Sequence, residues 1–142
     1  MVRLKHRYVI CQILEDVPST KNIYTTSDIM NAIKDKLSAF MGDYGAMYSC
    51  QVKYYDLESR IFIVRTSREA EIHMKAAISM VNTIKKSNII VRSLASCGSS
   101  RSCIEKLKIL LDLFISANTN NSDSDIEKYK SFYLTQIATI DI

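Results

Sequence analysis

The order of strand-like and helix-like segments is the feature that most constrains the fold of this chain. Four segments are rich in β-branched and aromatic residues, which is typical of strands: 7–14, 46–55, 60–66 and 88–94. Apolar residues at helical spacing fill two further segments, 27–41 and about 66–85. These two segments separate the first strand from the second and the third from the fourth. Asp56-Leu-Glu-Ser59 joins the middle strands as a short hairpin connection.

The resulting order, β-α-β-β-α-β, predicts a ferredoxin-like α/β (α+β) fold that RNA-recognition motifs share. Two helices would pack on one face of an antiparallel sheet with strand order 4-1-3-2. We expect a third helix over 102–115, a polar linker over 116–125 and a last helix over about 126–137. The predicted organisation is one domain (1–115), a linker (116–125) and a helical tail (126–142). Topology alone does not decide function, because metabolite-binding and enzymatic domains use it too.

Local signals predict where the helices begin and which residues they bury. Thr26 or Ser27 can cap the first helix, Gly42 stands where it ends, and Thr66 with Glu69 fits a capping box for the second. The apolar positions expected to face the core are Met30, Ile33, Leu37, Phe40 and Met41 in the first helix, Ala70, Met74, Ala77, Ile78, Val81 and Ile84 in the second, and Ile104, Leu107, Leu111 and Phe114 in the third.

The first strand is apolar on both sides, since Val9 and Cys11 alternate with Tyr8 and Ile10. A strand of this kind is covered on both faces. Either the third and fourth helices or a partner protein must cover the second face. The third strand carries a single aromatic residue, Phe62, so the sheet is not predicted to be an open platform on which RNA bases stack.

The net charge of +4 is unevenly placed. Residues 1–14 hold three basic residues and no acidic ones, and residues 85–115 hold six basic and two acidic residues. If the fold brings these blocks together, they form one positive surface suited to a phosphate backbone. The alternative is that both blocks are ordinary solvated faces.

The residues that enzymes and metal sites need are scarce. The chain has two histidines, His6 and His73, and its four cysteines include no Cys-x-x-Cys pair. We therefore predict buried, reduced thiols, no bound metal and no catalytic site. No run of about 18 apolar residues is present, so we expect an intracellular, soluble protein with no membrane partner.

Two segments are the best candidates for contacts with an anion. Gly98-Ser-Ser100 precedes the third helix, where backbone N–H groups and hydroxyls can meet a phosphate. Arg101 would add a charge, and the basic lead-in before the first strand would add Arg3, Lys5 and Arg7. The alternative for the loop is an ordinary turn between a strand and a helix.

Four motifs in order resemble the Pop5/Rpp14 family, the small protein subunits of ribonuclease P and ribonuclease MRP. They are Met1–Tyr8 before the first strand, Gly42–Gly45 after the first helix, Ile63–Glu69 between the third strand and the second helix, and Cys97–Arg101 before the third helix. The resemblance covers about residues 1–115. Phe62, Ser99 and Ser100 depart from the family's usual Gly, Thr and aliphatic residue at those positions.

The resemblance implies a non-catalytic, RNA-binding subunit. By that account a catalytic RNA with bound Mg²⁺ removes 5′ leaders from precursor tRNA, and the MRP form processes precursor rRNA. The implied partners are ribonuclease P/MRP RNA, an Rpp30/Rpp1-type subunit, an Rpp14/Pop8-type small subunit and, through the complex, precursor tRNA. The implied localisation is the nucleus and nucleolus, and no cofactor is expected on the chain itself.

These observations together give a candidate RNA-binding site. Its residues are Arg3, Lys5, Arg7, Arg65, Arg68, Gly98, Ser99 and Arg101. Arg65 and Arg68 have an alternative role as partners of Glu69 or Glu71. The competing functions are a scaffold that binds only proteins and a ferredoxin-like metabolite-binding domain.

Overall fold

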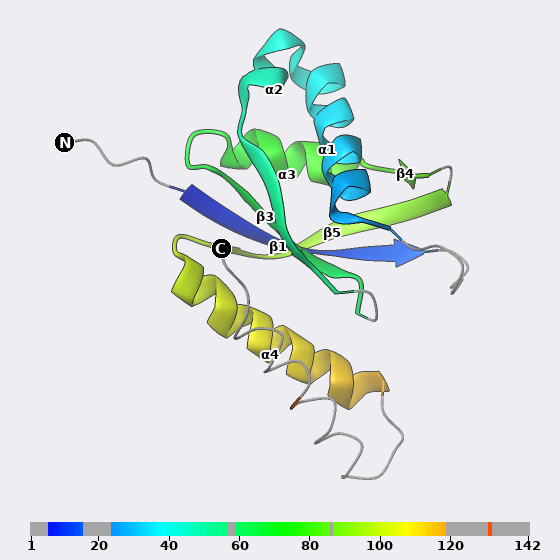
Figure 1. Ribbon diagram of the computed structural model, residues 1–142, viewed down its shortest axis with the longest axis vertical. Coiled ribbons are helices and arrows are strands. Elements are labelled where there is room, and N and C mark those ends of the chain that lie inside the picture. Colours follow the sequence, from blue (N-terminus) through cyan, green and yellow to red (C-terminus); the bar gives the residue numbers. More distant parts are fainter. Residues whose placement is uncertain (1–5, 16–23, 57–58, 86, 119–130, 132–142) are drawn as a thin grey trace, which may run out of the picture.

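The computed structural model describes residues 6–15, 24–56, 59–85, 87–118 and 131. In chain order its elements are β1 (His6–Glu15), α1 (Thr26–Met41), α2 (Asp43–Met47), β2 (Cys50–Tyr55), β3 (Ile61–Ser67), α3 (Glu71–Met80), β4 (Thr83–Ile84), β5 (Ser87–Cys97) and α4 (Ser100–Asn118). The strands form one curled sheet of order β2-β3-β1-β5-β4, and each neighbouring pair is antiparallel (Figure 1). The predicted ferredoxin-like fold is confirmed, with β5 as the predicted fourth strand and β4 as a short addition at the edge.

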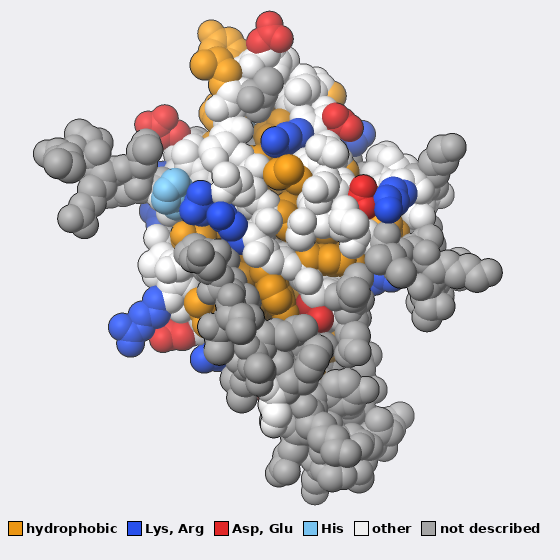
Figure 2. All heavy atoms as spheres, viewed as in Figure 1, with side chains coloured by type: hydrophobic (Ala, Val, Ile, Leu, Met, Phe, Trp, Pro, Cys, Tyr) orange, Lys and Arg blue, Asp and Glu red, His pale blue; other side chains and the backbone are white. Residues whose placement is uncertain are grey.

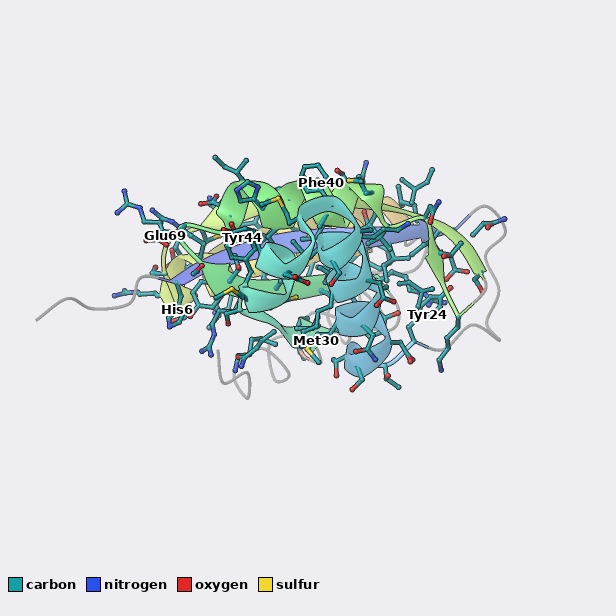
Figure 3. All side chains as sticks on the ribbon, turned by 90° about the horizontal axis from the view of Figure 1, so that it is seen from above. His6, Tyr24, Met30, Phe40, Tyr44 and Glu69 are labelled. Atoms are coloured by element: carbon teal, nitrogen blue, oxygen red, sulfur yellow. The ribbon has the colours of Figure 1, made fainter. Side chains whose placement is uncertain are left out.

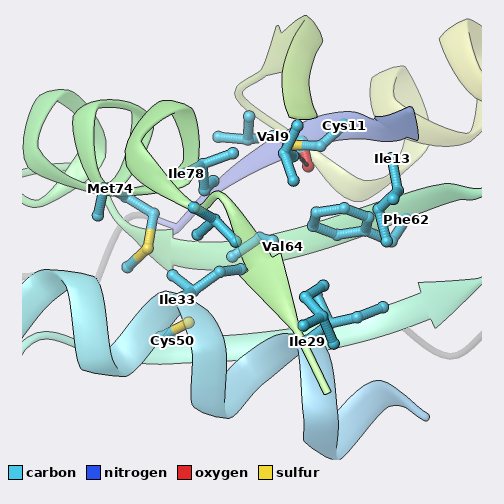
Figure 4. Packing of buried hydrophobic residues seen from close by; sticks show 14 of the residues in the cluster. Val9, Cys11, Ile13, Ile29, Ile33, Cys50, Phe62, Val64, Met74 and Ile78 are labelled. Carbon is cyan, nitrogen blue, oxygen red and sulfur yellow. Dashed lines mark hydrogen bonds between the residues drawn. The ribbon is translucent and has the colours of Figure 1, made fainter. Parts of the chain in front are cut away.

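Helices α1 and α3 cover one face of the sheet. Figure 4 shows their apolar side chains meeting those of β1 and β3. The buried residues at the centre of this layer are Val9, Cys11, Ile13, Ile29, Ile33, Leu37, Phe62, Val64, Met74, Ala77 and Ile78. All six apolar residues predicted for the second helix are buried, although Val81 and Ile84 lie beyond the end of α3. Helix α1 is rotated so that Ile29 is buried and Phe40 is 49% exposed.

Helix α4 covers the other face. Tyr8 and Ile10 of β1 contact its buried Leu107 and Leu111, and Cys97 lies against this layer at the end of β5. The prediction that β1 is covered on both faces is therefore confirmed. Of the two coverings considered, α4 supplies the second one within the chain.

The first helix begins with a capping box one residue earlier than predicted. Thr25 Oγ1 accepts from the Asp28 N–H at 3.2 Å, and Asp28 Oδ2 accepts from the Thr25 N–H at 2.9 Å. Gly42 ends the helix as predicted, with a positive φ of 62° that favours glycine. The chain then forms α2 rather than the predicted start of a strand at residue 46, and β2 begins only at Cys50.

The predicted capping box at Thr66 and Glu69 is wrong. Thr66 belongs to β3, and its hydroxyl donates to the Ser49 carbonyl at 2.9 Å. A turn follows in which the Ser67 carbonyl accepts from the Ala70 N–H at 3.2 Å, and α3 begins at Glu71. The tertiary bond to Ser49 uses the hydroxyl that the helix cap would need.

Three other boundaries differ from prediction in the second half of the chain. Helix α3 ends at Met80 rather than near Lys85, because Val81 is extended and β4 pairs back onto β5. Strand β5 continues to Cys97, so the predicted loop 95–100 shrinks to Gly98 and Ser99. Helix α4 runs from residue 100 to 118, into the predicted linker. The rest of the linker and, except for residue 131, the predicted tail helix lie outside the described residues.

The four cysteines are free and buried, as predicted. Burial raises the pKa of the Cys11 thiol to about 12 and that of Cys50 to about 11. Burial and the neighbouring Cys97 raise the pKa of Cys103 to about 12. The thiols of Cys11, Cys50 and Cys103 therefore stay protonated at neutral pH and are poor nucleophiles.

Candidate functional site

The antiparallel registers gather the predicted basic residues at one end of the sheet. Across β1, Tyr8 pairs with Arg65 on one side and with Cys97 on the other. The turns that follow β3 and β5 therefore leave the sheet at this same end, beside the beginning of β1. Figure 3 shows His6 and Glu69 here and Tyr24 at the opposite end. We call this region the basic end, defined by Arg7, Arg65, Arg68, Lys75, Gly98, Ser99, Arg101 and Lys106.

Arg7 and Gly98 make the closest contact between the two predicted segments. The Arg7 guanidinium lies so close over Gly98 that a β-carbon at that position would overlap Nη1. Gly98 therefore serves a close approach, which no larger residue permits without moving Arg7. Arg7, the described member of the predicted basic lead-in, therefore meets the turn before α4.

Glu71, at the start of α3, organises the side chains around this contact. Its carboxylate accepts a hydrogen bond from the Ser96 hydroxyl at 2.6 Å and forms ion pairs with Arg7 at 3.5 Å and Lys75 at 3.1 Å. The Ser96 hydrogen bond, then Lys75 and Arg7, hold the pKa of Glu71 below its ordinary value against the opposing effect of burial. Glu71 thus fixes Arg7 in place and offsets part of the local positive charge.

Ser99 caps α4 instead of presenting a free hydroxyl. Its Oγ accepts from the Ser102 N–H at 3.2 Å, and its carbonyl accepts from the Cys103 N–H at 3.0 Å. Earlier N–H groups in the first turn of a helix have no carbonyl acceptor within the helix. These backbone N–H groups remain available to an anion, while the Ser99 hydroxyl has a structural role.

Two cations of α4 stand beside this turn. The Arg101 side chain is 92% exposed, and its Nε lies 3.8 Å from Glu105 Oε1. An exposed ion pair at this distance holds the side chain only weakly. Lys106 was not among the predicted site residues. Its Nζ donates to the Ser96 carbonyl at 3.2 Å. This places the ammonium next to Glu71, Ser96, Arg7 and Lys75, which together with Lys106 we call the Glu71 cluster.

Arg65 and Arg68 belong to the same end but not to the Glu71 cluster. The Arg65 Nη2 donates to Gln51 Oε1 at 2.7 Å across β2 and β3. Arg68 is exposed in the turn before α3. Glu71, one of the two partners considered for these arginines, instead forms its ion pairs with Arg7 and Lys75 among the described residues.

Positive charge predominates at the basic end. Six basic residues (Arg7, Arg65, Arg68, Lys75, Arg101 and Lys106) stand with three acidic ones (Glu69, Glu71 and Glu105). In Figure 2, Lys and Arg side chains gather around the beginning of β1. Arg3 and Lys5, the remaining predicted site residues, lie outside the described residues.

Lys75, Lys106 and Glu71 are the members of the cluster that the sequence analysis missed. The spacing of Glu71 and Lys75 by four residues on a helix is a signal for an ion pair. No comparable signal identifies Lys106, because its partner is a backbone carbonyl on β5.

The described residues contain no group of three or more metal-binding side chains. Within the same part of the chain, no helix is long and apolar enough to cross a membrane. A groove of about 380 Å³ lies between α1 and β4, where Asp28 and Lys85 form an ion pair at 3.0 Å. Its lining is largely polar and charged, unlike the mostly apolar pockets that hold small ligands.

The sequence and the fold of this chain are both similar to those of known proteins. The model of the Rpp14/Pop5 family matches residues 7–108, from the first arginine of β1 into α4. The chain belongs to the Rpp14/Pop5 family. The resemblance inferred from the four motifs is thus confirmed, and the Rpp14/Pop5 match includes the β5–α4 turn and the Glu71 cluster.

Two individual proteins extend this result. A curated relative from Arabidopsis thaliana, named probable ribonuclease P/MRP protein subunit POP5, is 29% identical over 138 residues, covering 90% of this chain and 91% of the relative. A chain in the cryo-EM structure of yeast ribonuclease MRP has the same fold, with a TM-score of 0.55 at 10% identity, over 82% of this chain and 98% of that one. The Rpp14/Pop5 fold therefore persists where the sequences differ widely.

Proposed function

We propose that this chain is a non-catalytic protein subunit of ribonuclease P and ribonuclease MRP. Membership of the Rpp14/Pop5 family and the name of the Arabidopsis relative support this proposal. The chain binds the RNA of these particles through the basic end. It contributes binding and positioning, while the RNA of the complex, with its Mg²⁺, carries the hydrolysis.

The contact of Arg7 with Gly98 is the observation that carries the RNA-binding role. It brings Arg7 of β1 to the turn that starts α4, so a side-chain cation and backbone N–H groups face one region. Guanidinium groups and helix N-termini are both used to bind phosphates. The surplus of cations over carboxylates attracts the phosphate backbone without requiring any particular base.

The wider assembly follows from the same proposal. The holoenzyme removes 5′ leaders from precursor tRNA, and the MRP form processes precursor rRNA. The chain joins an Rpp30/Rpp1-type subunit and an Rpp14/Pop8-type small subunit, and it works in the nucleus and nucleolus.

Purification of the tagged full-length chain from cells tests membership of the particle. We expect at least one large structured RNA to be recovered with it, together with activity that removes the 5′ leader from a precursor tRNA. A matched preparation of the tag alone controls for RNA that adheres to the resin. Recovery of protein partners without any such RNA would contradict the proposal.

A scaffold that binds only proteins is the second candidate, favoured by exposed apolar side chains around α1 and α2. Phe40, Tyr44 and Met47 are 49%, 74% and 81% exposed. A salt titration separates the two functions. If several phosphates are bound, log affinity for RNA falls by about 0.7–0.9 per contact for each log unit of salt. A protein-only scaffold gives no such slope.

A further inference from the structure

The structure of the basic end also bears on which form of RNA it fits. We propose that it binds paired, helical RNA through phosphates and 2′-hydroxyls, with no readout of splayed bases. This inference rests on the proposed RNA-binding function and narrows its ligand to a class.

The central strands offer no ring to a base. Tyr8 of β1 faces α4 and is 6% exposed, and Phe62 of β3 faces α1 and α3 and is fully buried. Proteins that read single-stranded RNA on a sheet stack bases on aromatic side chains of such strands. Here α4 would have to leave the sheet, exposing Leu107, Leu111 and their neighbours, before that could happen.

Two rings near the basic end stack on each other, and the His6 imidazole at the start of β1 also lies at this end. Tyr48 stacks on His73, with ring centroids 5.6 Å apart and planes 12° from parallel. The strongly exposed rings among the described residues, Phe40 and Tyr44, stand on α1 and α2. Figure 1 shows α2 on the opposite side of the sheet from α4. Phe40 and Tyr44 therefore lie on the other side of the sheet from the α4 cations Arg101 and Lys106.

The cations, in contrast, are held in place by the fold. Glu71 positions Arg7 and Lys75, the Ser96 carbonyl holds Lys106, and Gln51 holds Arg65. They come from β1, β3, α3 and α4, so their spacing is set by the rigid sheet and its helices. A fixed array of cations loses little entropy on binding a rigid array of phosphates. A flexible single strand would have to be ordered to match it.

Binding of three RNA probes to the full-length chain tests this inference. Two are hairpins with stems of about 16 base pairs and scrambled sequences, a length that spans successive minor grooves. The third is an oligouridylate with the same number of phosphates. We expect both stems to bind equally and at least about tenfold more tightly than the oligouridylate at one salt concentration.

Two variants complete the experiment. The double substitution Phe40→Ser/Tyr44→Ser removes the exposed rings and should leave stem affinity unchanged, since loss of a stacking ring typically weakens binding about fivefold or more. Lys106→Ala should weaken binding of both stems, and Lys34→Ala, on the exposed side of α1, is its matched control.

Four outcomes would overturn the inference. Equal or tighter binding of the oligouridylate, or a difference of more than about tenfold between the two stems, contradicts it while leaving RNA binding intact. Loss of stem binding in the ring variant contradicts it in the same way. Absence of binding to all three probes contradicts both the inference and the proposed RNA-binding function.

Discussion

At the scale of single residues, Gly98 is the position where a minimal change tests the basic end most directly. A methyl group there would overlap the Arg7 guanidinium, which is the flexible end of its side chain. We expect Gly98→Ala to displace that group without unfolding the domain, changing the free energy of unfolding by less than about 1 kcal/mol. RNA affinity should fall roughly tenfold, about 1.4 kcal/mol, as expected for loss of one charged contact. Fluorescence anisotropy with a labelled RNA hairpin measures the affinities of the parent and the variant.

A double-mutant cycle provides the control for Gly98→Ala. If the substitution acts through Arg7, the variant Arg7→Ala/Gly98→Ala should bind RNA no more weakly than Arg7→Ala alone. Fully additive losses would show that Gly98 acts independently of the guanidinium.

Glu71 makes a residue-scale contribution to stability that depends on pH. The Ser96 hydroxyl, then Lys75 and Arg7, hold the pKa of its carboxyl below the ordinary value. The stabilisation is therefore complete above the unfolded pKa of about 4.3 and is lost as pH falls through the lower folded value. Glu71→Gln should lower the free energy of unfolding by about 1 kcal/mol at pH 7. Urea denaturation should show this difference shrinking as pH falls through and below about 4; a constant difference would exclude this role.

At the scale of elements, α4 is the helix that closes the second face of the sheet. Leu107 is fully buried there, whereas Leu113 on the same helix is 61% exposed. Leu107→Ala should lower the free energy of unfolding by about 2–5 kcal/mol, because it leaves a cavity against β1 and β3. Leu113→Ala, with the same change in chemistry and helix propensity, should stay within about 0.5 kcal/mol of the parent. Equal effects in chemical denaturation would mean that α4 is not packed on the sheet.

Element types were predictable where a pattern spans the whole element, and boundaries were not. The alternation in β1 and the apolar spacing of α3 depend on burial that repeats along the segment. The start of α3 depends instead on one tertiary hydrogen bond from Thr66 to Ser49. A local capping pattern cannot reveal a partner that lies outside it in sequence. The end of α3 likewise depends on β4 pairing with β5.

At the scale of the whole molecule, the strand order decides which distant residues become neighbours. The predicted order placed β1 between β3 and the last strand, and this arrangement brings Arg7 beside the turn between β5 and α4. It was not sufficient to predict the counter-charge. Glu71 lies over Arg7 because of how α3 packs, and Lys106 reaches Ser96 because β5 continues to Cys97. Packing details of this kind leave no pattern in the sequence.

Substitutions at the two ends of the sheet should therefore have different effects, one on stability and the other on RNA affinity. Opposite the basic end, Arg60 pairs with Glu15 at 3.2 Å, donates to the Tyr55 hydroxyl at 3.2 Å and lies 5.2 Å from the centroid of the Tyr24 ring. Arg60→Ala leaves the Glu15 carboxylate, whose side chain is 7% exposed, without this cation. We expect it to lower the free energy of unfolding by about 3 kcal/mol and to leave RNA affinity unchanged at temperatures where the variant is folded.

Arg101→Ala should give the opposite result, because this side chain is 92% exposed and only weakly paired. Its free energy of unfolding should stay within about 0.5 kcal/mol of the parent, while the slope of log affinity against log salt should fall by about 0.7–0.9. Thermal melting measures the stability of both variants, and salt titration of RNA binding measures the salt slope of both. If Arg60→Ala weakened RNA binding as much as Arg101→Ala, the phosphate contacts would extend over both ends of the sheet. If neither substitution changed the salt slope, Arg101 would lie outside the RNA contact.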